Sequence, residues 1–388
     1  MRPRANSRQR HSGNDVRIYL RVAALLTLPL VTLCCSVFAQ SPSEPALAHE
    51  AAQAEANGDT HKAMGLYEKA LAHSPAWTEG WWRYGGLLYG DRQFHAAAAA
   101  YGHLTVLAPQ NSLGFALLGM CEFELADWNN ASLHLNKALN RGTLPQNIAQ
   151  PAAYSLGLSL LHLKNWDGAL LTLKLLMRQA PDYPNLSLAM GAAELGLEST
   201  PSPADAVFPA VTLAGEGAKS IVEGRPKDAE RSYRELVTRY AAQPLAHLSF
   251  GLFLESEHRD EEAQKEFHDE IAVNPDSALT WIWIARVALV QLDPKTAHSA
   301  LAHVRDLGDR NPLASLIEGR SFMMEHQWEQ ALDPLREAEK LAPQSSEIHF
   351  ALATTYTALK QSEAAKKERE LFLQTSQVEA AGGGNADQ

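Results

Sequence analysis

The chain has 388 residues, of which 46% are hydrophobic and 20% are charged, and this composition excludes a disordered chain, a collagen-like repeat and a multi-span membrane protein. Its length predicts two to three globular domains or one extended repeat array. The 34 Lys and Arg against 45 Asp and Glu give a net charge of −11, which argues against the basic surface of a nucleic-acid-binding protein.

Residues 1–39 have the pattern of an export signal. Six arginines and one acid precede an uncharged apolar run from Val22 to Ala39. Val37 and Ala39 suit the −3 and −1 positions of a cleavage site, so we expect cleavage after Ala39 and a periplasmic or secreted protein. The alternative is an uncleaved inner-membrane anchor formed by residues 22–39, since 18 residues lie at the short end of spanning length.

Cleavage would leave a more acidic chain with one cysteine. Loss of residues 1–39 removes six Arg and one Asp and changes the net charge from −11 to −16. Lipid attachment at Cys34 or Cys35 is disfavoured, because Leu33 stands where lipoprotein signals usually have a small residue. The remaining thiol, Cys121, excludes a disulfide within the mature chain. We interpret it as a small packed hydrophobe, with a reactive or intermolecular thiol as the alternative.

A 34-residue period runs through the rest of the sequence. Ten similar segments begin near residues 44, 78, 112, 150, 184, 210, 244, 278, 312 and 346, and seven of the nine steps are 34 residues long. Positions within a repeat are counted from these residues. Position 8 is always Gly or Ala: Ala51, Gly85, Gly119, Gly157, Gly191, Gly217, Gly251, Ala285, Gly319 and Ala353. Position 20 is Ala in every repeat with a second helix: Ala63, Ala97, Ala131, Ala169, Ala229, Ala263, Ala297, Ala331 and Ala365.

This pattern predicts pairs of closely packed helices. Small residues at positions 8 and 20 allow two helices to approach, and larger apolar residues at position 24, from Tyr67 to Leu335, fill the interface. Proline at position 32, as in Pro75 and Pro109, ends the second helix. Position 17 begins it, with a capping residue before Trp128 and proline at 226 and 294.

These residues resemble the tetratricopeptide repeat (TPR) family. The clearest match is the set Trp81, Tyr84, Gly85, Ala97, Tyr101 and Pro109, and the resemblance extends over residues 44–374. It implies an all-α fold, an α-solenoid with a right-handed superhelix of about ten helix-turn-helix repeats. It also implies protein–protein interaction, with the ligand left open.

Two irregular steps suggest how the array is divided. The step from 112 to 150 is four residues longer than the period and predicts a bulging loop near Gly142. The step from 184 to 210 is eight residues short, and its prolines exclude a regular second helix. We therefore expect sub-arrays at 40–198 and 213–374, a Pro-rich hinge at 199–212 and a flexible tail at 375–388. Charged residues 366–370 suit a solvent-facing terminal cap.

Enzyme chemistry has little support in the sequence. It lacks the HExxH zinc motif, the GxxxxGK phosphate loop, a Cys-x-x-Cys pair and the GxSxG elbow. Glu255 and His258 have the spacing of half a di-iron motif, but His258 falls in a turn, so we interpret it as a solvated turn residue. We expect no catalytic residues, no cofactor and no metal site. Trp81 and Trp281, both at position 4, are expected to be core residues.

The family resemblance implies a ligand groove lined by the first helices. Carried over, its ligand-facing positions give Trp82, Tyr89, Met120, Phe123, Tyr154, Ile282, Arg286, Arg320, Met323, Met324 and Phe350. Such an apolar and aromatic wall suits an extended peptide or a partner helix. The alternative for each residue is packing between repeats.

The function expected from this pattern is a non-catalytic scaffold or adaptor in the cell envelope. It would bind another protein or peptide, without nucleic acid and without membrane insertion after cleavage; its oligomeric state stays open. The alternative is a chaperone or carrier for envelope assembly or polysaccharide export, and a more remote one is a TPR-containing hydrolase.

Overall fold

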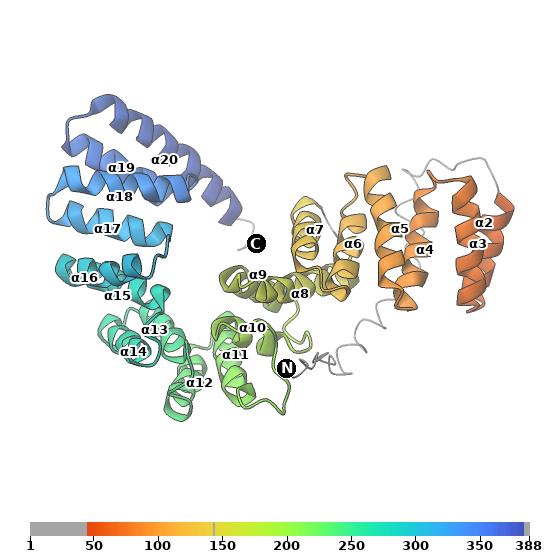
Figure 1. The fold of residues 1–388 in the computed structure, drawn as a ribbon, viewed down its shortest axis with the longest axis horizontal. Helices are drawn as coiled ribbons and strands as arrows, with labels where there is room; N and C mark the ends of the chain where they lie inside the picture. Colours follow the sequence, from red (N-terminus) through yellow and green to blue (C-terminus); the bar gives the residue numbers. More distant parts are fainter. Residues whose placement is uncertain (1–44, 143, 384–388) are drawn as a thin grey trace, which may run out of the picture. The chain divides into compact units, whose positions relative to one another are not determined.

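The computed structural model describes residues 45–142 and 144–383, and all regular secondary structure in these residues is α-helical (Figure 1). The predicted export segment 1–39 lies outside the described residues. The chain divides into two compact units, residues 1–232 (unit 1) and 233–388 (unit 2). Among the described residues, none of the helices is both long and apolar enough to span a bilayer.

Unit 1 contains the first ten described helices and the start of the eleventh. They are α2 (Pro45–Ala56), α3 (Thr60–His73), α4 (Thr78–Gly90), α5 (Phe94–Leu107), α6 (Ser112–Glu124), α7 (Trp128–Arg141), α8 (Gln146–His162), α9 (Trp166–Gln179), α10 (Leu186–Glu194), α11 (Phe208–Val222) and α12 (Pro226–Arg239), which continues into unit 2.

Unit 2 repeats the same helix pair four times. Its helices are α13 (Ala246–Ser256), α14 (Asp260–Val273), α15 (Ala278–Val290), α16 (Pro294–Asp306), α17 (Pro312–Met324), α18 (Trp328–Leu341), α19 (Ser346–Ala358) and α20 (Ser362–Gly383). Each pair packs as an antiparallel hairpin, and successive hairpins pack side by side. The predicted all-α, TPR-like solenoid of helix-turn-helix repeats is confirmed.

The small residues of the repeat lie where the period predicts. Alanines at position 20 are at most 1% exposed, and the large residues at position 24 at most 2%. Position 8 faces position 24 of the same hairpin: a Cβ on Gly85 would lie 2.6 Å from the Tyr101 ring, and one on Gly157 would lie 2.5 Å from Leu173. A larger residue at position 8 would therefore push the two helices apart.

The turn between the two helices has a fixed geometry. The residue at position 15 has positive φ in nine repeats. It is glycine in two of them, at Gly58 and Gly224. In the first non-glycine case, Arg92 N–H donates to Tyr89 and Gln93 N–H donates to Leu88, the bond pattern of a Schellman motif. The remaining non-glycine cases are Ala126, Lys164, His258, Leu292, His326 and Lys360.

The four additional residues of the long step lengthen a helix. Helix α8 has 17 residues and contains Pro151, so much of the insertion predicted as a bulging loop is helical. The non-helical connector after α7 begins at Gly142, whose φ of −173° is extended.

The short step, where a Pro-rich hinge at 199–212 was predicted, includes the start of a helix. The loop after α10 leads to α11, which begins at Phe208, so residues 208–212 are helical. Helices α10 and α11 pack together: a Cβ on Gly191 would overlap the carbonyl oxygen of Val211 and lie 2.7 Å from the nitrogen of Gly215. The segment 199–212 therefore joins two helices that pack within unit 1, and the division between the compact units falls inside α12.

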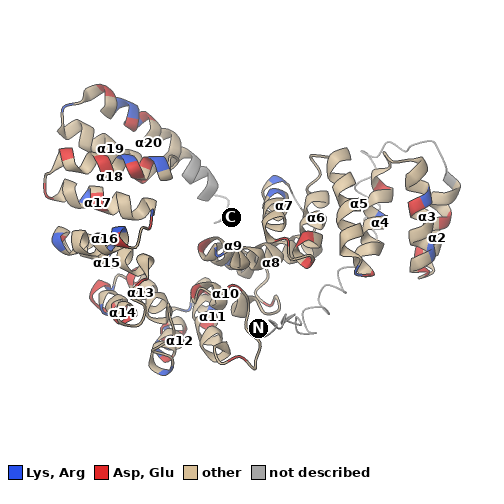
Figure 2. Ribbon diagram, in the orientation of Figure 1, with Lys and Arg blue, Asp and Glu red and all other residues tan. Residues whose placement is uncertain are grey.

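Charge is unevenly distributed among the helices. Figure 2 shows α5 without Lys, Arg, Asp or Glu, whereas α18 and α20 carry both signs. Helix α20 continues to Gly383, beyond residue 374, where the second sub-array was expected to end. Residues 366, 367, 369 and 370 are exposed, as a terminal cap requires, but Glu368 is buried at 4% exposure.

Candidate functional site

Four of the predicted groove residues lie inside the helix packing. Tyr89 is 8% exposed, Met120 1%, Tyr154 6% and Ile282 0%. Met120 and Tyr89 belong to one buried cluster with Leu104 and Leu135. These four side chains pack between helices, which was the alternative interpretation of each, and they are not available to a ligand on the surface.

The predicted residues of unit 1 that remain partly exposed are aromatic. Trp82 lies on α4 with the Arg83 guanidinium 5.8 Å from its ring, and Phe123 lies on α6 with its ring 5.4 Å from that of Trp128. Nearby, a hollow of roughly 320 Å³ between α3 and α4 is lined by Glu68, Leu71, Ala72, Pro75, Trp81 and Tyr84.

The two predicted arginines of unit 2 connect neighbouring first helices. Arg286 lies 3.4 Å from Glu255 of α13 and 4.6 Å from the Trp283 ring. Arg320 on α17 lies 2.5 Å from Glu347 on α19. Both guanidiniums are therefore paired within the chain, so this face is charged as well as apolar.

Apolar surface in unit 2 is found on α17 and α19. Met323 and Met324 are partly exposed near the end of α17. Phe350 on α19 is 53% exposed, and its ring lies 5.6 Å from that of Phe372. Helices α17 and α19 pack against each other, so the first-helix surface of this part of unit 2 includes Arg320, Met323, Met324, Glu347 and Phe350.

Position 4 is occupied in two repeats by a tryptophan anchored in the same way. Trp81 Nε1–H donates to the Pro75 carbonyl at 2.8 Å, and Trp281 Nε1–H donates to the Pro275 carbonyl at 3.0 Å. Each indole stacks on the histidine at position 26 of its repeat, at 4.2 and 4.1 Å between ring centroids. Both tryptophans are partly exposed, so they are packed at the edge of the core rather than within it.

In the repeats beginning at 244 and 346, position 4 is histidine, and each histidine is paired with a glutamate at position 23. His349 Nδ1 lies 2.7 Å from Glu368 Oε2, with the two side chains 2% and 6% exposed. His349 Nε2 lies 3.0 Å from the Pro343 carbonyl, which only accepts hydrogen bonds, so Nε2 carries a proton.

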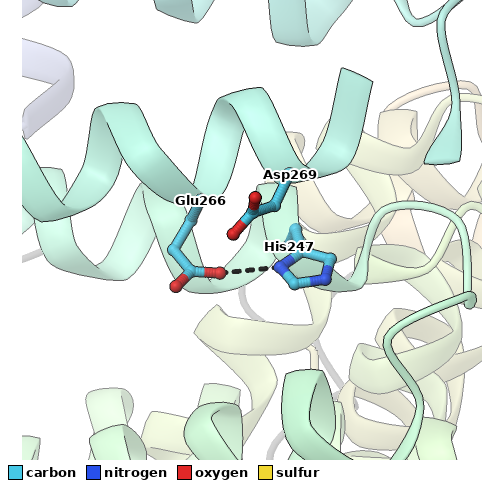
Figure 3. A group of neighbouring side chains, drawn as sticks. All are labelled: His247, Glu266 and Asp269. Atoms are coloured by element: carbon cyan, nitrogen blue, oxygen red, sulfur yellow. Dashed lines mark hydrogen bonds and ion pairs between the residues drawn. The ribbon is translucent and has the colours of Figure 1, made fainter. Parts of the chain in front are cut away.

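The second pair includes an additional carboxylate. His247 Nδ1 lies 2.7 Å from Glu266 Oε2, and Asp269 completes a group whose ligand atoms all lie within 4.8 Å of one another. Figure 3 shows the three side chains converging, His247 from α13 and both acids from α14. The hydrogen bond to the Glu266 carboxylate raises the pKa of the His247 imidazole above its usual value, although partial burial opposes the shift.

Next to this group, a fully buried carboxylate supports the start of α13. Glu270 is 0% exposed and accepts hydrogen bonds from the backbone N–H of Leu245 at 2.7 Å and of Leu248 at 3.4 Å. These donors belong to the first turn of α13 and have no partner within that helix. Glu270 of α14 therefore caps α13.

The isolated histidine and cysteine candidates have structural surroundings. His258 is exposed in the position-15 turn, with φ of 59°. Cys121 is 0% exposed, and burial raises the pKa of its thiol well above the usual range. The thiol therefore stays protonated and packs as a small hydrophobe, which argues against the reactive alternative.

The histidine–carboxylate groups were not found by motif spacing. Each histidine and its paired glutamate come from the two helices of one hairpin, so they are 19 residues apart in the sequence. The available signal lay in the period itself: position 23 is Glu where position 4 is His, and Ala where position 4 is Trp. This pairing becomes visible when repeats are aligned by position.

The solved structures that resemble this chain have low sequence identity and low TM-scores. Neither a protein-family model nor a curated protein matches the chain. Similar solved structures include a tetratricopeptide repeat protein from Parabacteroides merdae, with 13% identity over 71% of this chain and 97% of that chain and a TM-score of 0.34. MamA from Desulfovibrio magneticus has 18% identity over 45% of this chain and 96% of its own, with a TM-score of 0.38. A chain of the Cut9–Hcn1 hetero-tetramer of the APC/C has 13% identity over 85% of this chain and 79% of its own length, with a TM-score of 0.36.

Proposed function

We propose that the protein is a non-catalytic scaffold of the cell envelope that binds another protein through its first helices. The proposal depends on one observation: Phe350, an aromatic residue on the first helix α19, is 53% exposed. Aromatic and methionine side chains on a rigid helix suit recognition of an apolar partner segment.

The charged residues beside Phe350 support this choice of surface. Arg320 and Glu347 are 38% and 52% exposed at their side chains and pair with each other across α17 and α19. A polar margin beside apolar side chains is the usual arrangement of a protein interface. An extended peptide or a partner helix with apolar residues on one face fits this surface.

Site-specific photo-crosslinking tests the surface. A photo-reactive phenylalanine analogue at position 350 should crosslink a partner protein in cells. The matched control is position 373, because Leu373 is 56% exposed but lies on the second helix α20. The Phe350→Glu variant should lose the partner, whereas Leu373→Glu should keep it. Equal crosslinking from both positions would contradict the proposal.

Export is tested separately by the mature N-terminus. Residues 1–39 carry the basic and apolar pattern of a signal, so the purified mature protein should begin at Gln40 by mass spectrometry and fractionate with the envelope. Deletion of residues 2–39 should retain the protein in the cytoplasm. An unprocessed protein in the membrane fraction would instead support the uncleaved anchor.

A further inference from the structure

The same three positions of a hairpin come together in several repeats. In the repeats beginning at 78 and 278, positions 4, 23 and 26 are Trp, Ala and His, and the Trp and His rings stack. In the repeat beginning at 244, these positions are His247, Glu266 and Asp269. One packing arrangement thus holds an apolar stack in some repeats and three metal-ligand side chains in another.

We propose that His247, Glu266 and Asp269 bind a divalent transition-metal ion, for which Zn²⁺ is the probe. The imidazole and two carboxylates offer ligand atoms within 4.8 Å of one another. Three protein ligands with water completing the coordination is an arrangement that zinc sites use. The sequence motifs predict no metal site, and the proposed site is independent of the proposed partner surface.

Both helices hold the ligands firmly. Glu266 and Asp269 are three residues apart on α14 and therefore project from one face of that helix. His247 is in the first turn of α13, which the buried Glu270 fixes to α14. A bound ion would cross-link the two helices of this hairpin at the end where α13 begins.

The histidine distinguishes this group from the similar one formed by Glu339, His349 and Glu368. Each group has a partly exposed carboxylate that gives an ion a path from solvent, Asp269 in one and Glu339 in the other. His349, however, uses both ring nitrogens in hydrogen bonds within the chain, and the His349 and Glu368 side chains are 2% and 6% exposed against 11% and 12% for His247 and Glu266. We therefore assign the metal site to the His247 group alone.

Lys265 is the natural competitor of the ion. Its ammonium lies 2.7 Å from Asp269 and 3.8 Å from Glu266, and its side chain is 71% exposed. Metal binding would displace this amine into solvent. Removing the amine should therefore strengthen metal binding at this group, whereas metal bound elsewhere on the chain would not respond.

The test is a Zn²⁺ titration of the full chain after a chelator has removed bound metal. Calorimetry measures the affinity, and thermal unfolding measures the effect on stability. We expect a high-affinity site whose occupancy raises the unfolding temperature, while Mg²⁺ does neither. His247→Gln and Asp269→Asn should each weaken Zn²⁺ binding by at least about tenfold. Lys265→Gln should strengthen it.

The control variants are His258→Gln and His268→Gln. Both histidines are exposed and lie on the same hairpin, so neither variant should change Zn²⁺ binding by the site. Circular dichroism verifies that each variant folds. If His247→Gln does not fold, the test depends on Asp269→Asn and Lys265→Gln, because the first should weaken Zn²⁺ binding and the second should strengthen it. An unfolding temperature that does not respond to Zn²⁺, or the same response in Asp269→Asn as in the native chain, would overturn the proposal.

Discussion

In unit 1, helices α10 and α11 cross with backbone against backbone, whereas in unit 2 two hairpins enclose ionisable side chains. The crossing in unit 1 depends on Gly191 and Gly215, which leave no room for a Cβ. The hairpins of unit 2 hold the pairs His247–Glu266 and His349–Glu368. Among the described residues of unit 1, His134 and Glu122 form a similar pair, but their side chains are 23% and 12% exposed.

This difference shows that the repeat pattern restricts the distance between the two helices of a hairpin more strictly than it restricts the type of side chain that lies between them. Positions 8, 20 and 24 are small or apolar in both units, and they set the distance between helix axes. Positions 4 and 23 are then filled by Trp and Ala in the repeats beginning at 78 and 278, and by His and Glu in those beginning at 244 and 346. The first pair stabilises by buried apolar area and the second by hydrogen bonds that must all be satisfied.

The largest expected effect is the loss of one member of the buried pair in unit 2. Glu368→Ala should lower the free energy of unfolding by about 3–5 kcal/mol, because it leaves the buried His349 without its carboxylate. The double variant His349→Trp with Glu368→Ala should recover most of this loss, since it reproduces the Trp and Ala of the repeat beginning at 278. Urea unfolding followed by circular dichroism measures both.

The single variant His349→Trp is the control for that exchange. It leaves Glu368 buried without a histidine, so it should be less stable than the double variant. If the double variant is no more stable than Glu368→Ala, the two side-chain pairs are not interchangeable, and the comparison between repeats is wrong.

The next effect tests the backbone crossing in unit 1. Gly191→Ala should destabilise by about 3 kcal/mol, because the new methyl group meets the Val211 carbonyl and the helices must separate. Gly65→Ala is the matched control: Gly65 is also helical, a Cβ there meets no atom within 4 Å, and better helix propensity should stabilise by up to about 1 kcal/mol. Equal effects of the two variants would show that close approach at Gly191 is unimportant.

Much of the fold could be predicted from the sequence because its strongest constraints are local and repeated. The small residues at positions 8 and 20 recur at a fixed period, and each repeat folds mainly against its neighbours. The short step could not be interpreted in this way. Its missing second helix is compensated by the crossing at Gly191 and Gly215, and nothing in the period indicates which helix then packs against α10.

The candidate surface was harder to predict than the fold. Tyr89 and Met120 occupy ligand-facing positions of the family, yet both are buried, because a first helix also packs against the next repeat and one position can serve either role. Glu368 was expected in solvent because it lies in a charged run. Its burial follows from His349, whose imidazole requires a partner in the core.

A smaller effect is expected at the buried cap of unit 2. Glu270→Ala should destabilise by about 2 kcal/mol, because the N–H groups of Leu245 and Leu248 lose a charged acceptor. Glu261→Ala is the control, since Glu261 is exposed on the same helix. Hydrogen exchange should show the loss of protection in the first turn of α13, and uniform loss across unit 2 would argue against a local cap.

The smallest effects concern the turn that both units share. Position 15 has φ of 61° at Leu292 in unit 2 and 67° at Gly224 in unit 1. Leu292 is 75% exposed, so Leu292→Gly removes left-handed strain with little loss of packing and should stabilise by about 0.5–1 kcal/mol. Gly224→Ala should destabilise by a similar amount, because its Cβ meets no atom and only the backbone conformation opposes it. Urea unfolding measures the change in the free energy of unfolding for each variant. Because both turns have a residue of positive φ at position 15, which glycine adopts without strain, the two changes should have opposite signs. Changes of the same sign would mean that the two turns are not equivalent.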